Sequence, residues 1–460
     1  MLLWNSVFLW CDQGEGGDRE IEETMKWVRP WGAIGCLAGI LLGAGGCAEK
    51  QTPEQLTVWH WMSDREGVFQ ELAERYHTLT GVSVRFDLFA PSDAYSQKVK
   101  AAAQTDTLPD IFGILGEKRD LASFILSGHV ANFNQEMDRE EGLWRHSFFE
   151  KALAMNEFAP DNSYGVPPGI FGVPIDVNTI QWVYNKELFR KAGLDPNKPP
   201  VTWKAWIHIG KKLKSKGIQG LVSGWGEIWL IECLVSNFAW NLMGQEKVLA
   251  TIQGKVPYTD PDWIRVLKLF QEMSQEGILA DGIVTMINKR AEQIFSNGQA
   301  ALAMNGSWCV NVYYGMNPNL DYGVILPPRI SSKYPQVIWG GASSFMVNAK
   351  SKRQQQAIAF LKWLTAKDQQ VYLSNQTRNL PATRAALTDI PAVLAGFADD
   401  MDRVVHPSVL PVAEFPSVTE ALTKGIQSII IGEKTPEQIA QEAQDLKERE
   451  MAKKLARTTQ

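Results

Sequence analysis

Strands alternate with helices in the first part of the chain body, and this alternation constrains the fold more than any other feature. The segment 56–61 is rich in residues that favour β-strands, 82–86 alternates between apolar and polar residues, and 108–113 is an apolar strand ending in turn residues. Between these strands, 66–80 carries apolar residues at helical spacing, and 95–104 is a second helix. This β-α-β-α-β order predicts a sheet covered by helices, so we expect an α/β protein.

Later segments continue the pattern on both sides of a break rich in glycine and proline. The segment 164–174 contains Gly-Val-Pro twice, which predicts a break between two bodies. The body has about 410 residues, too many for one hydrophobic core and enough for roughly two domains. We expect strands at 179–184, 300–304, 322–326 and 344–348, and helices at 186–192, 203–215, 228–243, 260–276, 291–297, 352–365 and 435–457.

A leader precedes this body. Lys26 and Arg29 give it a basic start, the sixteen residues 31–46 carry no charge, and Cys47 follows. The order of basic region, short apolar region and small-residue cleavage site is typical of a secretory signal. The cysteine at the cleavage site resembles a bacterial lipoprotein signal, which implies that Cys47 is lipidated. An ordinary cleaved signal and a short anchor helix are the alternatives.

The segment 1–24 is acidic and does not fit the start of a secretory signal. We therefore expect translation to start at Met25, with a signal peptide at 25–46, and residues 1–46 are excluded from the fold. The prediction is a protein of the cell envelope that is anchored by lipid and faces the periplasm or the cell exterior.

Composition excludes several classes of function. The net charge of −5 gives no basic footprint for nucleic acid. No second apolar run approaches the length of a membrane span, so we expect a soluble body. The body keeps only Cys233 and Cys309, far apart and without metal-ligand spacing, so we expect two buried thiols, no metal and no cofactor. A disulfide between the two cysteines in an oxidising compartment is the alternative.

No motif of an enzyme stands out. The sequence lacks the patterns of serine hydrolases, zinc peptidases, P-loop proteins and dinucleotide-binding proteins. Its many carboxylates could form a glycosidase pair, but nothing singles out two of them. Thirteen of the seventeen tryptophans follow the leader, and tryptophan supplies either core volume or flat apolar faces for ligands such as sugars. Composition alone leaves both uses open.

Several segments in order resemble the family 1 extracellular solute-binding proteins of ABC importers, the maltose-binding-protein class. The most specific block is 295–308, Phe-Ser-Asn-Gly-Gln-Ala-Ala-Leu-Ala-Met-Asn-Gly-Ser-Trp. The resemblance covers about residues 56–445, nearly the whole mature chain. The other blocks are the strand 56–59, Leu-Pro-Asp-Ile at 108–111, the crossing strand 177–189, Pro-Pro-Val-Thr-Trp at 199–203, 322–327, and Gly-Gly-Ala at 340–342.

This resemblance implies the type II periplasmic-binding-protein-like fold: two α/β lobes joined by a multi-segment hinge, with a ligand cleft between them. The implied N-terminal lobe comprises 53–172 and 309–375, and the C-terminal lobe comprises 177–305 and 380–450. The implied function is the substrate-binding component of an ABC importer. Such a monomer binds a sugar or oligosaccharide by lobe closure and delivers it to the transmembrane permease subunits, without catalysis.

The resemblance also implies ligand-binding residues. Trp308 falls where the family often stacks an aromatic ring on a sugar, and Trp339 and Gly340 lie by a loop that approaches ligand in many relatives. Asn178 lies at the lobe crossing, where maltose binders often carry an acidic residue, which argues against maltose itself. The other candidates are His60, Trp61, Ser63 and Asp64 after the first strand, the aromatic and carboxylate group Trp225, Glu227, Trp229 and Glu232, and the charged residues Glu117, Arg378 and Glu414.

Other ligand classes and functions stay open. The same fold could bind a glycerophosphodiester or a polyamine. A phosphate ligand should need a cluster of Arg or Lys at the cleft, and the sequence shows none. The carboxylates of Asp64, Glu227 and Glu232 leave a polyamine possible. A secreted glycan-active enzyme and a surface adhesion protein without a transport partner are the remaining alternatives.

Overall fold

The computed structural model describes residues 55–90, 92–115, 118–390, 394–399, 401–405 and 414–458. The leader with the lipidation candidate Cys47, and the ligand candidate Glu117, lie outside the described residues. No helix within these ranges is both long and apolar enough to cross a membrane.

The first sheet has five strands in the order β2-β1-β3-β12-β6. The strand β1 pairs in parallel with β2 and β3, and β12 pairs antiparallel with β3 and β6. The expected β-α-β-α-β order of the opening segment is confirmed. The strands are β1 (Gln55–His60), β2 (Ser83–Leu88), β3 (Ile111–Gly113), β6 (Val173–Pro174) and β12 (Ser344–Val347), and the associated helices include α1 (Glu66–Thr80), α2 (Ser92–Gln104), α3 (Lys118–Leu126), α13 (Gln354–Leu364) and α14 (Lys367–Thr377).

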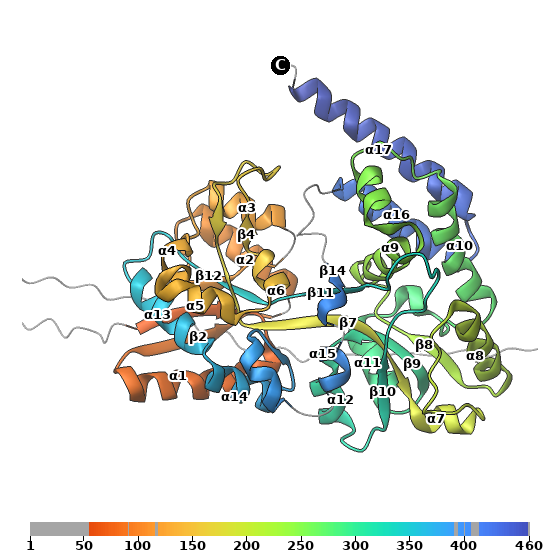
Figure 1. Cartoon of the computed structure of the whole chain (residues 1–460), viewed down its shortest axis with the longest axis horizontal. Helices are drawn as coiled ribbons and strands as arrows, with labels where there is room; N and C mark the ends of the chain where they lie inside the picture. Colours follow the sequence, from red (N-terminus) through yellow and green to blue (C-terminus); the bar gives the residue numbers. More distant parts are fainter. Residues whose placement is uncertain are drawn as a thin grey trace, which may run out of the picture. The chain divides into compact units, whose positions relative to one another are not determined.

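The second sheet is built around β7 (Asp176–Asn185), the long yellow arrow near the middle of Figure 1. Its order is β14-β11-β7-β9-β8, and β10 and β13 also pair with β7. The other strands are β8 (Gln219–Val222), β9 (Ala300–Gly306), β10 (Tyr322–Ile325), β11 (Ile338–Gly341), β13 (Leu380–Pro381) and β14 (Val404–Val405). The helices of this part include α7 (Lys186–Lys191), α8 (Trp203–Ser215), α9 (Trp229–Ile252), α10 (Pro261–Gln275), α11 (Asn288–Ser296), α12 (Cys309–Met316), α16 (Pro416–Ile430) and α17 (Pro436–Thr458).

Pairing of the strands bears on where the chain passes between the sheets. The segment 309–375, which was expected in the first lobe, begins with α12, and α12 contacts α11. The segment continues with β10 and β11, and both strands pair antiparallel with β7 in the second sheet. Only from β12 onward does this segment join the first sheet. The return to the first sheet therefore lies after Gly341, and the lobe boundaries themselves stay a prediction.

Local sequence explains where several helices begin and end. The helix α1 stops at Gly81, which takes a left-handed φ of 76° and donates its N–H to the His77 carbonyl. The side chains of Asn185 and Thr202 accept from the backbone N–H groups of Leu188 and Ala205, so each caps the helix that follows it.

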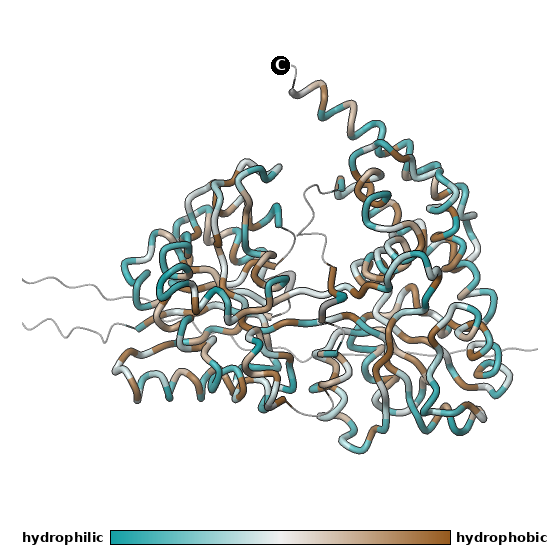
Figure 2. The backbone as a smooth tube through the Cα atoms, viewed as in Figure 1, coloured by the Kyte–Doolittle hydropathy of each residue, from teal (hydrophilic) through white to brown (hydrophobic). Residues whose placement is uncertain are grey.

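The two sheets pack into separate apolar clusters. Around the first sheet, Phe69 stacks on Phe86 with ring centroids 4.7 Å apart. Beside the second sheet, the buried rings of Trp182 and Trp206 meet edge to face at 4.5 Å. Figure 2 shows much of the backbone of the strands in brown, whereas teal predominates along α17. Burial of this apolar surface is the main favourable term that holds each sheet to its helices.

The two body cysteines, Cys233 and Cys309, are both buried and unbridged. This confirms the prediction of two buried thiols.

Candidate functional site

A cavity of about 770 Å³ opens between residues of the two sheets. Its walls come from the segment after β1, the start of α3, the middle of β7, α11, α12 and the β11–β12 turn. Parallel strands and their following loops place polar side chains at one sheet edge, which is where ligands bind in α/β proteins. This cavity is therefore the candidate functional site.

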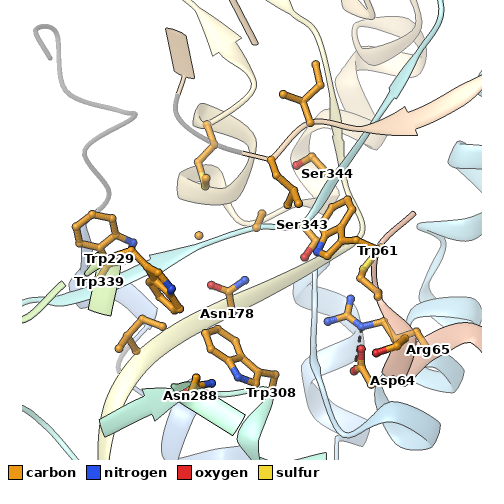
Figure 3. A pocket seen from close by; sticks show the side chains of 18 of the residues that line it. Trp61, Asp64, Arg65, Asn178, Trp229, Asn288, Trp308, Trp339, Ser343 and Ser344 are labelled. Carbon is orange, nitrogen blue, oxygen red and sulfur yellow. Dashed lines mark ion pairs between the residues drawn. The ribbon is translucent and has the colours of Figure 1, made fainter. Parts of the chain in front are cut away.

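Four tryptophans line the cavity: Trp61, Trp229, Trp308 and Trp339. Figure 3 shows three of them grouped around Asn178, with Trp61 on the other side near Ser343 and Ser344. The ring centroids of Trp229 and Trp308 are 6.1 Å apart at an interplanar angle of 45°. The cavity thus offers flat apolar faces beside amide and hydroxyl groups, which together suit a ligand with both apolar faces and polar edges.

Glycine permits the placement of two of these rings. A Cβ at Gly306 would lie 1.9 Å from the ring of Trp308, and a Cβ at Gly113 would lie 2.1 Å from the ring of Trp61. Each indole therefore lies directly over a backbone that carries no side chain. Both glycines end a strand, so strand and glycine together aim each ring at the cavity.

A buried ion pair supports the first-sheet side of the cavity. The guanidinium of Arg65, which is 6% exposed, pairs with the carboxylate of Asp176, and its Nε lies 3.5 Å from Oδ2 of Asp64 (Figure 3). The other oxygen of Asp176 accepts from the backbone N–H of Ser343 at 2.8 Å. Burial disfavours the charge of Arg65, but the carboxylates of Asp176 and Asp64 together outweigh this and raise the pKa of Arg65.

A buried carboxyl group lies on the second-sheet side. Glu292 is 7% exposed, and its Oε1 accepts from the amide groups of Asn288 and Asn305, each at 3.0 Å. Burial raises the pKa of Glu292, and the two amide donors offset part of that effect. Sequence reasoning missed this residue, because an acidic side chain on a helix is ordinarily solvated.

A lysine lines the cavity where α3 begins. Lys118 donates from Nζ to the backbone carbonyl of Ala154 at 2.9 Å, and its ammonium lies 4.9 Å from the ring centroid of Phe158. Burial lowers the pKa of Lys118 to about 8. A second lysine, Lys289 on α11, also lines the cavity and is exposed. No cationic cluster could be predicted from the sequence, because these lysines are 171 positions apart and only the fold brings both to one cavity.

The structure brings seven of the predicted ligand residues together in the cavity wall. They come from the segment after β1, from near the start of β7, from the start of α9, from the residue before α12 and from β11. These residues are Trp61, Ser63, Asp64, Asn178, Trp229, Trp308 and Trp339. Their role in binding a ligand stays a prediction.

Three other candidates lie in the protein core. The imidazole of His60 is fully buried and meets the rings of Phe69 and Phe86 edge to face, with Nε2 2.8 Å from a carboxylate oxygen of Glu66. Trp225 is also fully buried and packs on Phe270 at 6.0 Å. Gly340 lies within β11, where a Cβ would meet Val404 and the backbone carbonyl of Asn178. None of the three lines the cavity.

The charged candidates outside the cavity have structural partners. Glu227 accepts from the backbone N–H of Asn288 at 2.8 Å and so holds the start of α11 beside the cavity. Arg378, at a left-handed φ of 48°, stacks its guanidinium 3.5 Å from the ring centroid of Tyr314.

The last two candidates lie farther along the chain. Glu414 accepts from Tyr258 at 2.9 Å and pairs with Lys447. Glu232, on the first turn of α9, is half-buried and is not among the residues that line the cavity.

Within the described residues, no group of three or more His, Cys, Asp or Glu side chains is arranged to hold a metal ion. The cavity wall is rich in aromatic, amide and hydroxyl groups instead. Such groups bind by stacking and hydrogen bonding rather than by coordination.

Comparisons with known proteins agree with this geometry. A family model described as bacterial extracellular solute-binding protein matches residues 71–399. A putative binding protein of Brucella abortus (strain 2308) is 22% identical over 425 residues, which cover 90% of this chain and 97% of that protein. The sn-glycerol-3-phosphate-binding periplasmic protein UgpB of Brucella melitensis biotype 1 is 30% identical over 230 residues, which cover only 48% of this chain and 52% of that protein.

A solved structure shows the same fold. A chitin oligosaccharide binding protein superposes with a TM-score of 0.71 at 21% identity, over 86% of this chain and 100% of that chain. The expected fold, the type II periplasmic-binding-protein class, is thereby confirmed.

Proposed function

This chain belongs to the bacterial extracellular solute-binding protein family, and from that membership we propose that it binds a sugar or oligosaccharide in the tryptophan-lined cavity and delivers it to an ABC permease. The observation that carries the proposal is the set of four tryptophans around a cavity of about 770 Å³. That volume suits a small ligand such as a short oligosaccharide.

The chemistry of the wall supports a sugar. Pyranose rings present C–H faces that stack on indole and hydroxyl edges that exchange hydrogen bonds. The rings of Trp229 and Trp308 are close enough to contact one ligand that stacks across both of them. Asn178 lies among the tryptophans and carries both a donor and an acceptor, which match sugar hydroxyls. The neighbour of known structure that is named for chitin oligosaccharides supports the same ligand class.

A polyamine is less well supported by the same wall. A polycationic ligand needs carboxylates with spare charge, but Asp64 lies against Arg65 and accepts from Asn379. The Glu292 carboxyl is already hydrogen-bonded by two amides, and burial favours its neutral form. Both carboxyl groups therefore already have polar partners within the protein.

Binding without chemistry suits the proposed role. A ligand that contacts both walls binds more tightly when the walls are close together. It therefore stabilises this closed state over the open one. The permease would then recognise the liganded arrangement.

The proposal includes a lipid anchor at Cys47, which would keep the protein at the membrane surface beside the permease. The signal-like order of residues 25–47 supports it. Replacing Cys47 with serine should release the protein from the membrane fraction, and continued membrane association would contradict the anchor.

The test of the ligand class is a thermal-shift screen of the purified protein against neutral mono-, di- and oligosaccharides, polyamines and sn-glycerol 3-phosphate. A ligand that binds only the folded form raises the unfolding midpoint by mass action. We expect a rise with one sugar series. In Trp308→Ala the rise should shrink, whereas Trp363→Ala, which removes a ring outside the cavity, should keep it. A response to polyamines and to no sugar would overturn the proposal.

A further inference from the structure

We propose that the end of the cavity at the start of α3 is an anion subsite, in which Lys118 receives a carboxylate or phosphate group carried by the ligand. This inference rests on the sugar-binding function proposed above and narrows it from neutral sugars to acidic ones.

The position of Lys118 gives it access to a ligand. Lys118 is the first residue of α3, and both Lys118 and Leu121 on the first helical turn line the cavity. The ammonium carries three N–H donors, and one of them is used by the Ala154 carbonyl. Since no other acceptor among the described residues uses this ammonium, two donors remain there for a group inside the cavity.

The charge of Lys118 is not compensated by the described part of the protein. No carboxylate among the described residues lies within ion-pair distance of its Nζ. Glu157 contributes a favourable field from farther away, but the guanidinium of Arg145 already pairs with that carboxylate. The aromatic ring of Phe158 and the Ala154 carbonyl are weaker substitutes for water. A ligand that brings an anion would replace the missing partner.

The same protein shows what a structural buried lysine looks like. Lys447 on α17 is 1% exposed, and it pairs with Glu414 and donates to the backbone carbonyl of Ile252. That lysine brings its own carboxylate and lies away from the cavity. Lys118 is partly buried, lines the cavity and has no such carboxylate within the described ranges, so packing alone does not account for it.

Two further groups add positive charge at this cavity: the N-terminus of α3 and the ammonium of Lys289. The helix α3 is nine residues long, and its N-terminus carries the positive end of the helix dipole on the turn that holds Lys118. The exposed ammonium of Lys289 enters the wall from α11. The third cation, Arg65, pairs with both Asp176 and Asp64, so these three side chains together carry one negative charge, which offsets only one of the two lysines. The remaining positive charge therefore favours a negatively charged ligand over a neutral one.

The test is calorimetric titration of the full protein with matched probes. The neutral probes are chitobiose, xylobiose and raffinose. Two anionic probes are sugars: digalacturonate, which carries carboxylates, and glucose 1-phosphate, which carries a phosphate. The other two, sn-glycerol 3-phosphate and inorganic phosphate, carry a phosphate without a sugar. The variants are Lys118→Met, which removes the charge, Lys118→Arg, which keeps it, and Lys191→Met, which removes an exposed charge on α7 outside the cavity.

We expect an acidic sugar to bind at least about tenfold more tightly than any neutral probe, because a charge-assisted hydrogen bond to a partly buried cation is among the stronger polar contacts. Lys118→Met should weaken the acidic sugar about tenfold or more and change neutral probes less than about twofold. Lys118→Arg should restore most of the affinity, and Lys191→Met should leave it unchanged.

The outcomes separate the two proposals. Tight binding of a neutral sugar, with no preference for acidic probes and no effect of Lys118→Met, would overturn the subsite and leave the sugar-binding function standing. Binding of sn-glycerol 3-phosphate or phosphate that depends on Lys118, with no response to any sugar, would support the subsite and overturn the sugar. The carboxylate and phosphate probes distinguish which anion the subsite takes.

Discussion

The two walls of the cavity differ in chemistry. The wall built on the second sheet presents Trp229, Trp308 and Trp339 around Asn178. The wall built after the first sheet has one tryptophan, Trp61, among charged groups. The aromatic wall can recognise the shape of a ligand, because stacking depends on flat apolar faces. The charged wall can recognise its charge.

Within the charged wall, two cations have opposite uses. Arg65 is neutralised by Asp176, whose other oxygen holds the backbone of Ser343, so its charge serves the fold. Lys118 has no carboxylate of its own within the described residues, so its charge is available to a ligand. The role of a cation in a binding cavity, in the fold or in ligand binding, therefore depends on which partners it already has.

We expect the greatest change in stability when the buried pair of Arg65 and Asp176 is broken. Arg65→Met leaves Asp176 as an unpaired buried charge, and breaking a buried pair from one side typically costs about 3–5 kcal/mol of stability. Urea denaturation should show this as a lower free energy of unfolding. Lys191→Met, which breaks an exposed pair on α7, should leave the urea midpoint unchanged. Stability of Arg65→Met equal to wild type would show that this pair does not support the wall.

The second test addresses the glycines beneath one tryptophan of each wall. An alanine at Gly306 or Gly113 would push its Cβ into the ring of Trp308 or Trp61, and such overpacking typically costs about 1–3 kcal/mol. We expect ligand affinity to fall in both variants, measured by calorimetry, because each ring must leave its place over the backbone.

Gly67→Ala is the matched control, since a Cβ there meets nothing within 4 Å. Its affinity for the ligand should equal that of wild type. If Gly306→Ala kept full affinity, the position of the Trp308 ring would not matter for binding.

In the absence of ligand, Lys118→Met should raise the free energy of unfolding slightly, whereas Arg65→Met should lower it. The pKa of Lys118 is about 8 in the folded protein against a reference of 10.5, so the folded state binds this proton less tightly than the unfolded state. The destabilising charge is therefore fully present below pH 8 and fades as the pH rises toward 10.5. After discounting for solvent screening, we expect the variant to gain about 1 kcal/mol near neutral pH.

Thermal unfolding at pH 7 and at pH 10 checks this sign. The gain of Lys118→Met over wild type should be larger at pH 7. A variant that is less stable than wild type at pH 7 would show that the lysine serves the fold, and the contrast with Arg65 would fail.

The smallest effect is expected on the aromatic wall. Glu292→Gln keeps an Oε1 acceptor for Asn288 and Asn305, so the hydrogen bonds survive the change. Because the folded pKa of Glu292 is raised, its ionised form is disfavoured by folding, and this cost grows as the pH rises from the reference value of 4.5 through the folded pKa. The variant should therefore gain less than about 1 kcal/mol at pH 7 and nothing below pH 4.

Denaturation of wild type and Glu292→Gln at pH 7 and below pH 4 measures this gain in stability. Glu292→Ala, which leaves the two amides without their acceptor, should be destabilised at both. A loss of stability in Glu292→Gln at pH 7 would show that the carboxylate form is needed there.

Much of the fold could be predicted from local pattern. The alternation of strands and helices in the opening segment and the caps at Asn185 and Thr202 depend on neighbours within a few residues, so the sequence carries them directly. The same pattern could have excluded His60, because it shares its side of β1 with the buried Leu56 and Val58, whereas Trp61 follows the strand and reaches the cavity.

The tryptophans show where local pattern stops. Trp225 and Trp229 are four residues apart, yet the first is fully buried against Phe270 and the second lines the cavity. Both fit the expectation for an aromatic residue near a helix start. Only the packing of α10 against this segment decides which ring is covered.

The amino-acid sequence was sufficient to predict the family, the α/β class and the order of most strands and helices, and it contains enough tryptophan for both core and cavity. Contacts across the fold bring Arg65 to Asp176, 111 positions away, and leave Lys118 without a carboxylate partner among the residues that the structure describes. The physical reason is that burial and charge pairing are set by contacts between segments distant in sequence, so the use of a charged side chain follows from its neighbours in space.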